Sequence, residues 1–166
     1  MPVMIKCYVI LTFLLINASF CCGNNTVILS DSSKVSLITC SPGSDLYNAF
    51  GHSAVRINDS RLNMDITFSY GAYDFSRSNF TKDFFSGRLR FMLVIEMTED
   101  FLKAYILENR HITEVEISLS QIEKQKVLDY LLWNADLVNR NYEYDFFTNN
   151  CATKIRDVFE TLQPTT

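Results

Sequence analysis

The chain has 166 residues, of which 48% are hydrophobic and 13% aromatic, and its formal net charge is −4. This length and apolar content predict one globular domain and exclude a disordered or fibrous chain. The Lys and Arg residues are scattered singly rather than gathered in a stripe, so we expect no nucleic-acid partner.

Residues 1–23 have the pattern of a secretory signal. Lys6 precedes an apolar run over residues 7–20 that contains no charged side chain, as in the n-region and h-region of an export signal. A buried core helix is the alternative, because the run is short for a transmembrane helix. No second stretch of membrane-spanning length follows. We therefore predict an exported protein, either periplasmic or tethered to a periplasm-facing membrane through its N-terminus.

The site of signal cleavage has two interpretations. Residues 18–21, Ala-Ser-Phe-Cys, loosely resemble a lipoprotein signal, but Phe20 is bulky where a small residue is expected. Ordinary cleavage near Cys22 is the alternative. Residues 24–33 are polar and predict a linker, and the folded domain is predicted to span residues 34–163.

The first half of the domain has the alternation of β-strands. We predict three strands, the last two joined by a hairpin-like turn and antiparallel, over residues 35–40, 52–58 and 64–70. A short helix over residues 45–50 is expected to end at Gly51. His52 then opens the second strand.

Residues 71–89 are rich in Phe, Tyr, Ser and Gly and predict a long loop with a helical turn near residues 79–85. Loops of this length in compact domains often form the walls or lids of sites. Phe80, Phe84 and Phe85 are therefore candidate substrate-binding residues. The alternative is that these side chains only cover the core.

The second half combines strands and helices. The nearly continuous apolar run at residues 90–97 is typical of a central strand buried on both faces. After it we predict a helix capped by Thr98, an edge-like strand and a long helix with a capping box, over residues 99–109, 113–119 and 120–139. Trp133 is expected in the core. These elements predict an α+β fold in which an antiparallel sheet packs with helices.

The segment around Cys151 has the most specific chemical pattern. An aromatic strand over residues 142–147 leads through a Thr-Asn-Asn turn into a helix, with Asn150 near the cap and Cys151 in the first turn. Unpaired N–H groups and the positive end of the helix dipole favour a thiolate there. The alternative is a disulfide with Cys40, because an exported domain meets an oxidising compartment.

A reactive thiolate needs a base, and the chain has two histidines. His111 is expected in a solvated loop or helix end, which leaves His52 as the predicted partner. Asp65 or Thr67 on the next strand is a candidate to support the His52 ring, and Tyr70 competes for that role. No cluster of His and Cys has metal-ligand spacing, so we expect neither a metal nor another cofactor.

A thiolate at a helix N-terminus facing an imidazole is the arrangement of papain-like enzymes, which attack an acyl carbon and form a thioester. Candidate oxyanion donors are the backbone N–H of Cys151 and the side chains of Asn150 and Tyr144. His52 precedes the cysteine, the reverse of papain's order, which fits a circularly permuted layout. Arg56 is a candidate for binding an acidic headgroup, although its alternation with apolar neighbours also suits an ordinary strand surface.

Several ordered motifs resemble the Lnb N-terminal periplasmic domain family. They are residues 36–43, 50–57, 70–75, 139–146 and 150–153. The resemblance implies a permuted papain-like α+β fold related to NlpC/P60, with His52 and Cys151 as the catalytic pair. For the family's lipoprotein N-acyltransferases, it implies transfer of an acyl chain to the α-amino group of a diacylated lipoprotein. Members of that kind resemble a periplasmic domain followed by membrane helices, so we expect a fragment, a short paralogue or action from a lipid anchor.

The sequence is consistent with three functions. The first is an acyltransferase that takes its acyl chain from a phospholipid or lipoprotein, with an apolar groove walled by Phe80, Phe84, Phe85 and Phe91. The second is a cysteine peptidase or amidase acting on cell-wall peptides, with an open polar cleft. The third is a non-catalytic exported module in which the two domain cysteines are paired.

Overall fold

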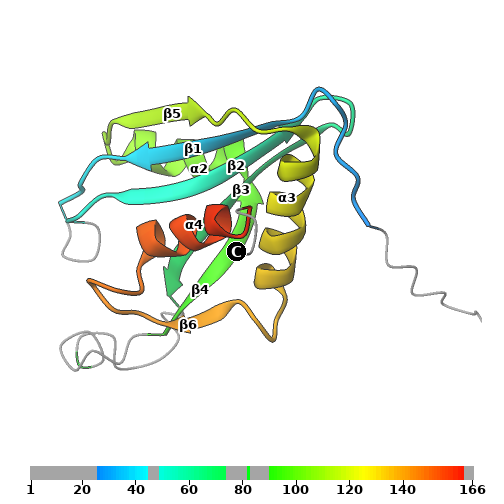
Figure 1. The fold of residues 1–166 in the computed structure, drawn as a ribbon. Coiled ribbons are helices and arrows are strands. Elements are labelled where there is room, and N and C mark those ends of the chain that lie inside the picture. Colours follow the sequence, from blue (N-terminus) through cyan, green and yellow to red (C-terminus); the bar gives the residue numbers. More distant parts are fainter. Residues whose placement is uncertain (1–25, 45–48, 74–81, 83–89, 163–166) are drawn as a thin grey trace, which may run out of the picture.

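The computed structural model describes residues 26–44, 49–73, 82 and 90–162. Within these residues the chain forms a six-stranded antiparallel sheet with helices on both faces (Figure 1). The predicted α+β class is therefore confirmed. The predicted helix at 45–50 and the helical turn at 79–85 lie largely outside the described residues.

Each strand of the sheet is antiparallel to its neighbours. From one edge to the other the strands are β5 (Ile112–Glu116), β1 (Lys34–Cys40), β2 (His52–Asp59), β3 (Met64–Tyr73), β4 (Arg90–Met97) and β6 (Asn141–Glu143). A register shift interrupts the β3–β4 pairing between Tyr70 and Ala72. The predicted hairpin of β2 and β3 and the predicted edge position of β5 are both confirmed.

The helices lie in two layers. α2 (Thr98–Leu107) covers one face of the sheet, and α3 (Gln121–Ala135) and α4 (Cys151–Glu160) cover the other (Figure 1). α3 begins with the predicted capping box, in which the Ser120 hydroxyl accepts from the Glu123 N–H and the Glu123 carboxylate accepts from the Ser120 N–H. Capping boxes satisfy two helix-end donors at once, which explains why this helix begins where the sequence predicts.

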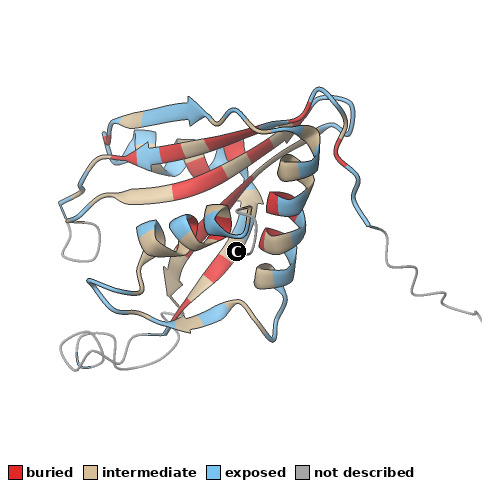
Figure 2. Ribbon diagram, in the orientation of Figure 1, coloured by how far each residue is buried: buried red, intermediate tan, exposed pale blue. Residues whose placement is uncertain are grey.

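Two apolar cores result from the period-2 alternation of the strands. Figure 2 shows buried residues along the central strands and on the sheet-facing sides of α3 and α4. The smaller core, between the sheet and α2, contains Ile38, Cys40, Ala54 and Phe101. The larger core, between the sheet, α3 and α4, includes Val55, Ile57, Phe68, Tyr70, Leu93, Val127, Leu128, Leu131, Ile155 and Val158.

The structure corrects three sequence predictions. β4 is not buried on both faces: Ile95 is 43% exposed, because β6 pairs only with residues 90–92 and leaves the rest of β4 as an edge. Trp133, predicted in the core, is 57% exposed on the outer side of α3. Thr98 does not cap α2, because its buried hydroxyl is hydrogen-bonded to the Thr67 hydroxyl at 3.0 Å and the cap position is Met97.

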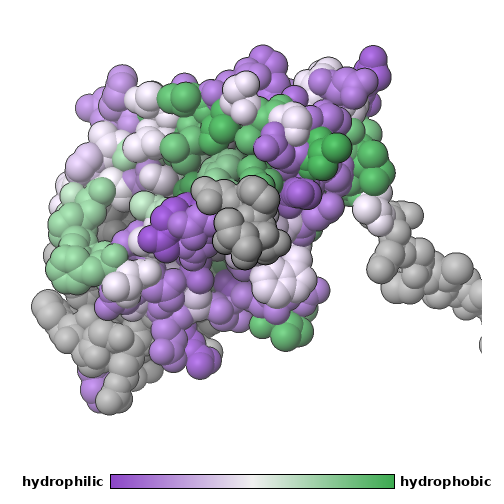
Figure 3. All heavy atoms as spheres, viewed as in Figure 1, coloured by the Kyte–Doolittle hydropathy of each residue, from purple (hydrophilic) through white to green (hydrophobic). Residues whose placement is uncertain are grey.

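Among the described residues, every helix is too short or too polar to span a bilayer. Figure 3 shows polar and apolar side chains mixed over the face that carries α3 and α4, with an apolar patch at the left margin, on the side where α4 begins. Exposed aromatic residues near this point of the fold are Phe50, Phe146 and Phe147.

Candidate active site

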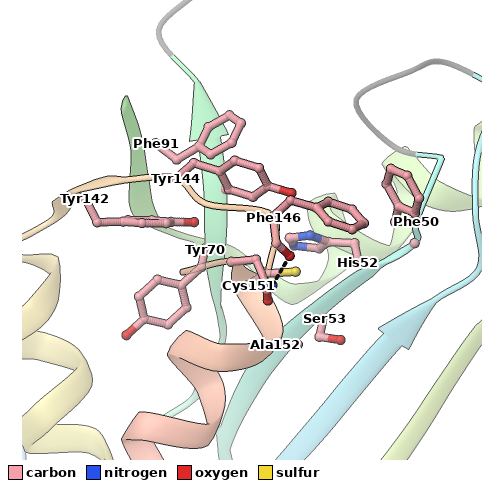
Figure 4. A pocket seen from close by; sticks show the side chains of 13 residues that line it. Phe50, His52, Ser53, Tyr70, Phe91, Tyr142, Tyr144, Phe146, Cys151 and Ala152 are labelled. Carbon is pink, nitrogen blue, oxygen red and sulfur yellow. Dashed lines mark hydrogen bonds between the residues drawn. The ribbon is translucent and has the colours of Figure 1, made fainter. Parts of the chain in front are cut away.

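A cavity of about 280 Å³ lies where the start of α4 meets the ends of β2, β3 and β6. Its lining includes both predicted catalytic residues, Cys151 and His52 (Figure 4). In this view the sulfur of Cys151 is directed toward the His52 ring. The structure thus brings together a thiol and an imidazole that are about a hundred residues apart in sequence.

Cys151 is the first residue of α4 and is partly exposed. Asn150 caps this helix, because its side-chain oxygen accepts from the Thr153 N–H at 3.1 Å, while the Thr153 hydroxyl accepts from the Asn150 N–H at 2.8 Å. The predicted turn and helix start are therefore confirmed. Helix N-terminal N–H groups surround the thiol with partial positive charge, which favours an anion there.

The disulfide alternative does not hold, because Cys40 and Cys151 are both free. Cys40 is buried between the sheet and α2, whereas Cys151 packs with the core under α3 and α4. Burial raises the pKa of the Cys40 thiol to about 11. Since the thiolate is the nucleophilic form, Cys40 is an inert internal reference for the reactivity of Cys151.

Gly51 fixes where β2 and His52 begin. Its φ is +79°, and a Cβ on this residue would lie 2.7 Å from the Cys40 carbonyl oxygen. Only glycine combines this backbone conformation with so close an approach of two chain segments. The turn therefore places His52 at the start of β2, at one end of the sheet.

The His52 ring is held on three sides. Its Nε2 is hydrogen-bonded to the Ser69 hydroxyl at 2.9 Å, and it stacks on Tyr105 of α2 with centroids 6.0 Å apart and planes 9° apart. Phe101 packs beside it at 6.2 Å. Burial, and secondarily the positive charge of Arg110, lower the pKa of His52 from 6.5 to about 4. The imidazole is therefore neutral at neutral pH and able to accept a proton.

Asp65 does not support His52, contrary to the sequence prediction. Asp65 lies opposite Asn58, which is six residues after His52 on β2. Its carboxylate accepts two hydrogen bonds from the Arg56 guanidinium, at 2.8 and 2.7 Å. The supporting residue is Ser69, which the sequence reasoning missed. The hairpin register could have indicated it, because pairing Asp59 with Met64 places Ser69 near His52 on the same face.

Arg56, predicted to bind a headgroup, is not at the cavity. Its guanidinium is bonded to Asp65 on one side and to Glu114 at 2.9 and 3.0 Å on the other. These residues lie on β2, β3 and β5, and none of them lines the cavity that contains Cys151. The alternative interpretation of Arg56 as an ordinary strand-surface residue therefore holds.

The hydroxyl groups of Tyr70 and Tyr142 differ in their position relative to Cys151 and His52. Tyr70 is 1% exposed, and Figure 4 shows its hydroxyl directed away from Cys151 and His52, so it does not orient the imidazole. The Tyr142 hydroxyl is buried and has no hydrogen-bond partner within the described part of the chain. The pKa of Tyr142 is raised, first by burial and then by the proximity of the Cys151 charge. Tyr142 was missed by the sequence reasoning, which named Tyr144 two residues later.

Gly71 leaves open the space between His52 and Tyr142. A Cβ on Gly71 would lie 3.7 Å from His52 Cε1 and 4.0 Å from the Tyr142 hydroxyl, so the imidazole and the phenol approach the same point. An unbonded O–H donor beside a thiol and its base is what a developing oxyanion requires.

Tyr144 and Asn150, the other predicted oxyanion donors, both line the cavity but differ in whether their polar atoms are already hydrogen-bonded. Tyr144 lines the cavity, with its ring edge-on to Phe91 at 4.7 Å, and stays a candidate oxyanion donor. Asn150 also lines it, but its amide nitrogen donates to the Phe146 carbonyl at 2.8 Å and its oxygen caps α4, so both polar atoms are already bonded. Phe80, Phe84 and Phe85 lie outside the described residues.

The fold and this cavity define a class: an α+β protein with a cysteine–histidine cleft at the end of an antiparallel sheet. The chain belongs to the Lnb N-terminal periplasmic domain family, whose model matches residues 25–166. The predicted family is thus confirmed, and a periplasmic domain family agrees with the export signal predicted at the N-terminus. Searches of curated proteins and of solved structures gave no match.

Ser69→Ala tests the role of Ser69 as a positioning residue. We expect alkylation of Cys151 to slow about tenfold, because the ring loses the hydrogen bond that fixes its tautomer. Nitrogen NMR of the His52 ring should show the loss of one dominant tautomer, a change that a merely structural role would not cause. Ser69→Thr keeps the hydroxyl and should retain the rate; an unchanged tautomer in Ser69→Ala would contradict the assignment.

Proposed function

We propose that this protein is an exported thiol enzyme that forms an acyl-thioester on Cys151 and transfers the acyl group to the N-terminus of a lipoprotein. The observation that carries the proposal is the shared cavity. A thiol at a helix N-terminus, a buried neutral imidazole and a phenol that has no hydrogen-bond partner in the described part of the chain line the same space. The order of His52 before Cys151, with α4 packed on the sheet, supports a permuted papain-like relationship to NlpC/P60 proteins.

In the first step, one nitrogen of His52 accepts the proton of the Cys151 thiol. In this step the Nε2–H of His52 donates to the Ser69 hydroxyl, so Nδ1 carries no proton and takes that of the Cys151 thiol. The sulfur attacks the acyl carbon of the donor, and a C–S bond forms. The bond between the acyl carbon and the leaving oxygen breaks, and the imidazolium returns its proton to that oxygen.

The tetrahedral intermediate carries a negative oxygen that needs donors. The backbone N–H of Cys151, at the start of α4, is one donor, since the first N–H groups of a helix have no partner within it. The Tyr142 hydroxyl is the second, because it is buried and no described residue is hydrogen-bonded to it. Such preorganised donors lower the barrier by about 3 kcal/mol each.

The walls of the cavity favour an acyl chain over a polar peptide. Phe91, Phe146 and Phe50 line it together with Tyr144, and the rings of Phe50 and Phe146 meet edge to face at 4.5 Å. Phe50 is 70% exposed, so apolar surface continues from the cavity to the rim. Buried aromatic and aliphatic walls with a few polar groups are typical of sites for apolar ligands.

The test is formation of the acyl-enzyme. We expect the full-length exported protein, incubated with p-nitrophenyl octanoate or with phosphatidylethanolamine vesicles, to gain one acyl group on Cys151 by intact mass. Neutral hydroxylamine should remove the group, as it does from a thioester. Cys40→Ala is the matched control and should still be acylated, whereas Cys151→Ala should not.

Two results would overturn the proposal in different ways. Absence of an adduct with every donor tested would remove the acyl-thioester chemistry. Cleavage of cell-wall peptides by the wild-type protein but not by Cys151→Ala, without acyl transfer from lipid, would assign the same residues to a peptidase or amidase.

A further inference from the structure

A second cavity, of about 280 Å³, lies on the α2 side of His52. It shares Gly51, His52 and Gly71 with the cavity that contains Cys151. Its other walls come from β3, β4, α2 and the residues that follow α2, Glu108 and Arg110. His52 therefore stands between two spaces, one that holds the thiol and one that does not.

Arg110, which lines the second cavity, has a buried donor with no partner among the described residues. Arg110 is 8% exposed, and its guanidinium lies 4.4 Å from the centre of the Tyr105 ring. Its Nε donates to the Ser41 carbonyl at 2.7 Å, and its Nη1 donates to the Glu108 carboxylate at 3.2 Å. Its Nη2 is buried and has no partner among the described residues. Leaving such a donor unbonded costs free energy that a ligand's carbonyl oxygen would recover.

The same cavity contains a carboxylate that no described cation neutralises. Glu96 lines it and forms no ion pair within the described part of the chain. The pKa of Glu96 is raised by burial and then by the charge of Asp100. Tyr105 lines the same cavity as Glu96, and the Arg110 guanidinium lies over its ring. A ligand ammonium would relieve the unpaired carboxylate.

We propose that this second cavity binds the acyl acceptor as a primary amine with an adjacent carbonyl, the amine held by Glu96 and the carbonyl oxygen by Arg110 Nη2. This inference rests on the proposed function and adds to it where the second substrate binds and which side chains select it. His52, which belongs to both cavities, connects the amine to the acyl group on Cys151.

Attack of the bound amine on the thioester transfers the acyl group from sulfur to nitrogen. The bound ammonium gives one proton to the Glu96 carboxylate, and the neutral amine attacks the thioester carbon. A C–N bond forms, the C–S bond breaks, and the second amine proton passes through His52 to the departing sulfur of Cys151. The products are an amide, a free thiol and a protonated Glu96, which releases its proton to solvent.

The first experiment measures binding without chemistry. Glycinamide, which has an amine beside a carbonyl, is titrated into the full-length Cys151→Ala protein while the NMR signals of the His52 ring are followed. We expect saturable shifts at millimolar glycinamide and none with N-acetylglycinamide, whose amine is blocked. Glu96→Gln should weaken binding at least tenfold, whereas Glu99→Gln, a change at an exposed carboxylate of α2, should leave it unaltered.

The second experiment measures the fate of the acyl-enzyme. With p-nitrophenyl octanoate as donor, glycinamide should divert octanoyl groups from water to N-octanoylglycinamide, with saturation. Glu96→Gln should lower this diversion about tenfold at a fixed glycinamide concentration. Diversion that rises linearly without saturation, or is equal in Glu96→Gln and the wild type, would overturn the acceptor site. Failure to form any acyl-enzyme would instead overturn the proposed function. The glycinamide titration of Cys151→Ala would then still show whether the second cavity binds an amine.

Discussion

Alkylation of Cys151 by iodoacetamide at pH 6 is expected to slow about 100-fold when His52 is replaced by alanine. An unassisted thiol with the ordinary pKa of about 8.5 has well under 1% thiolate at this pH, whereas a neutral imidazole beside the sulfur can take its proton. The rate is measured by mass spectrometry of labelled peptides, with the buried Cys40 as internal reference. His111→Ala is the matched control, because that histidine is exposed and outside the cavity.

The pH dependence of the same reaction has a definite sign. His52 has a lowered pKa of about 4, so it stays neutral and available from neutral pH down to that value. Below it the imidazole is protonated and no longer accepts the thiol proton. We therefore expect labelling to continue to about pH 4 and then to fall tenfold per pH unit, as one coupled titration of the pair. A fall that begins near pH 6.5 would contradict a buried His52, and equal rates in wild type and His52→Ala would remove the imidazole from the chemistry.

Tyr142→Phe is expected to slow acylation of Cys151 by p-nitrophenyl octanoate about 100-fold, the usual effect of removing one oxyanion donor. Alkylation by iodoacetamide should be unchanged, because displacement at its methylene carbon develops no oxyanion. Burst measurements of p-nitrophenol release and the labelling assay give the two rates on the same protein. The difference between them separates a donor to the transition state from a residue that only supports the thiol.

The control for this prediction is Tyr130→Phe, on α3 and away from the cavity lining, which should leave both rates as they are. Equal losses of acylation and alkylation in Tyr142→Phe would indicate a packing defect instead. A loss of acylation in Tyr144→Phe but not in Tyr142→Phe would transfer the donor role to the tyrosine that the sequence analysis proposed.

The sequence by itself determined the features that depend on neighbouring residues. The capping box at Ser120 and Glu123, the cap at Asn150 and the position of Cys151 at the start of α4 are all local hydrogen-bonding patterns. The placement of His52 at the start of β2 follows from Gly51, whose conformational freedom is likewise a local property. The family, too, was identified from short ordered motifs.

Only the tertiary structure decided which side chains surround the thiol and the imidazole. Asp65 and Ser69 lie four residues apart on β3. The strand register places Ser69 within hydrogen-bonding distance of His52, and Asp65 within hydrogen-bonding distance of Arg56. Tyr70 precedes the irregularity in β3, and its hydroxyl faces away from the cavity (Figure 4). Alternation along a strand says only that neighbours point to opposite faces. Which face meets a helix, and which group it meets there, depends on pairings between segments far apart in sequence.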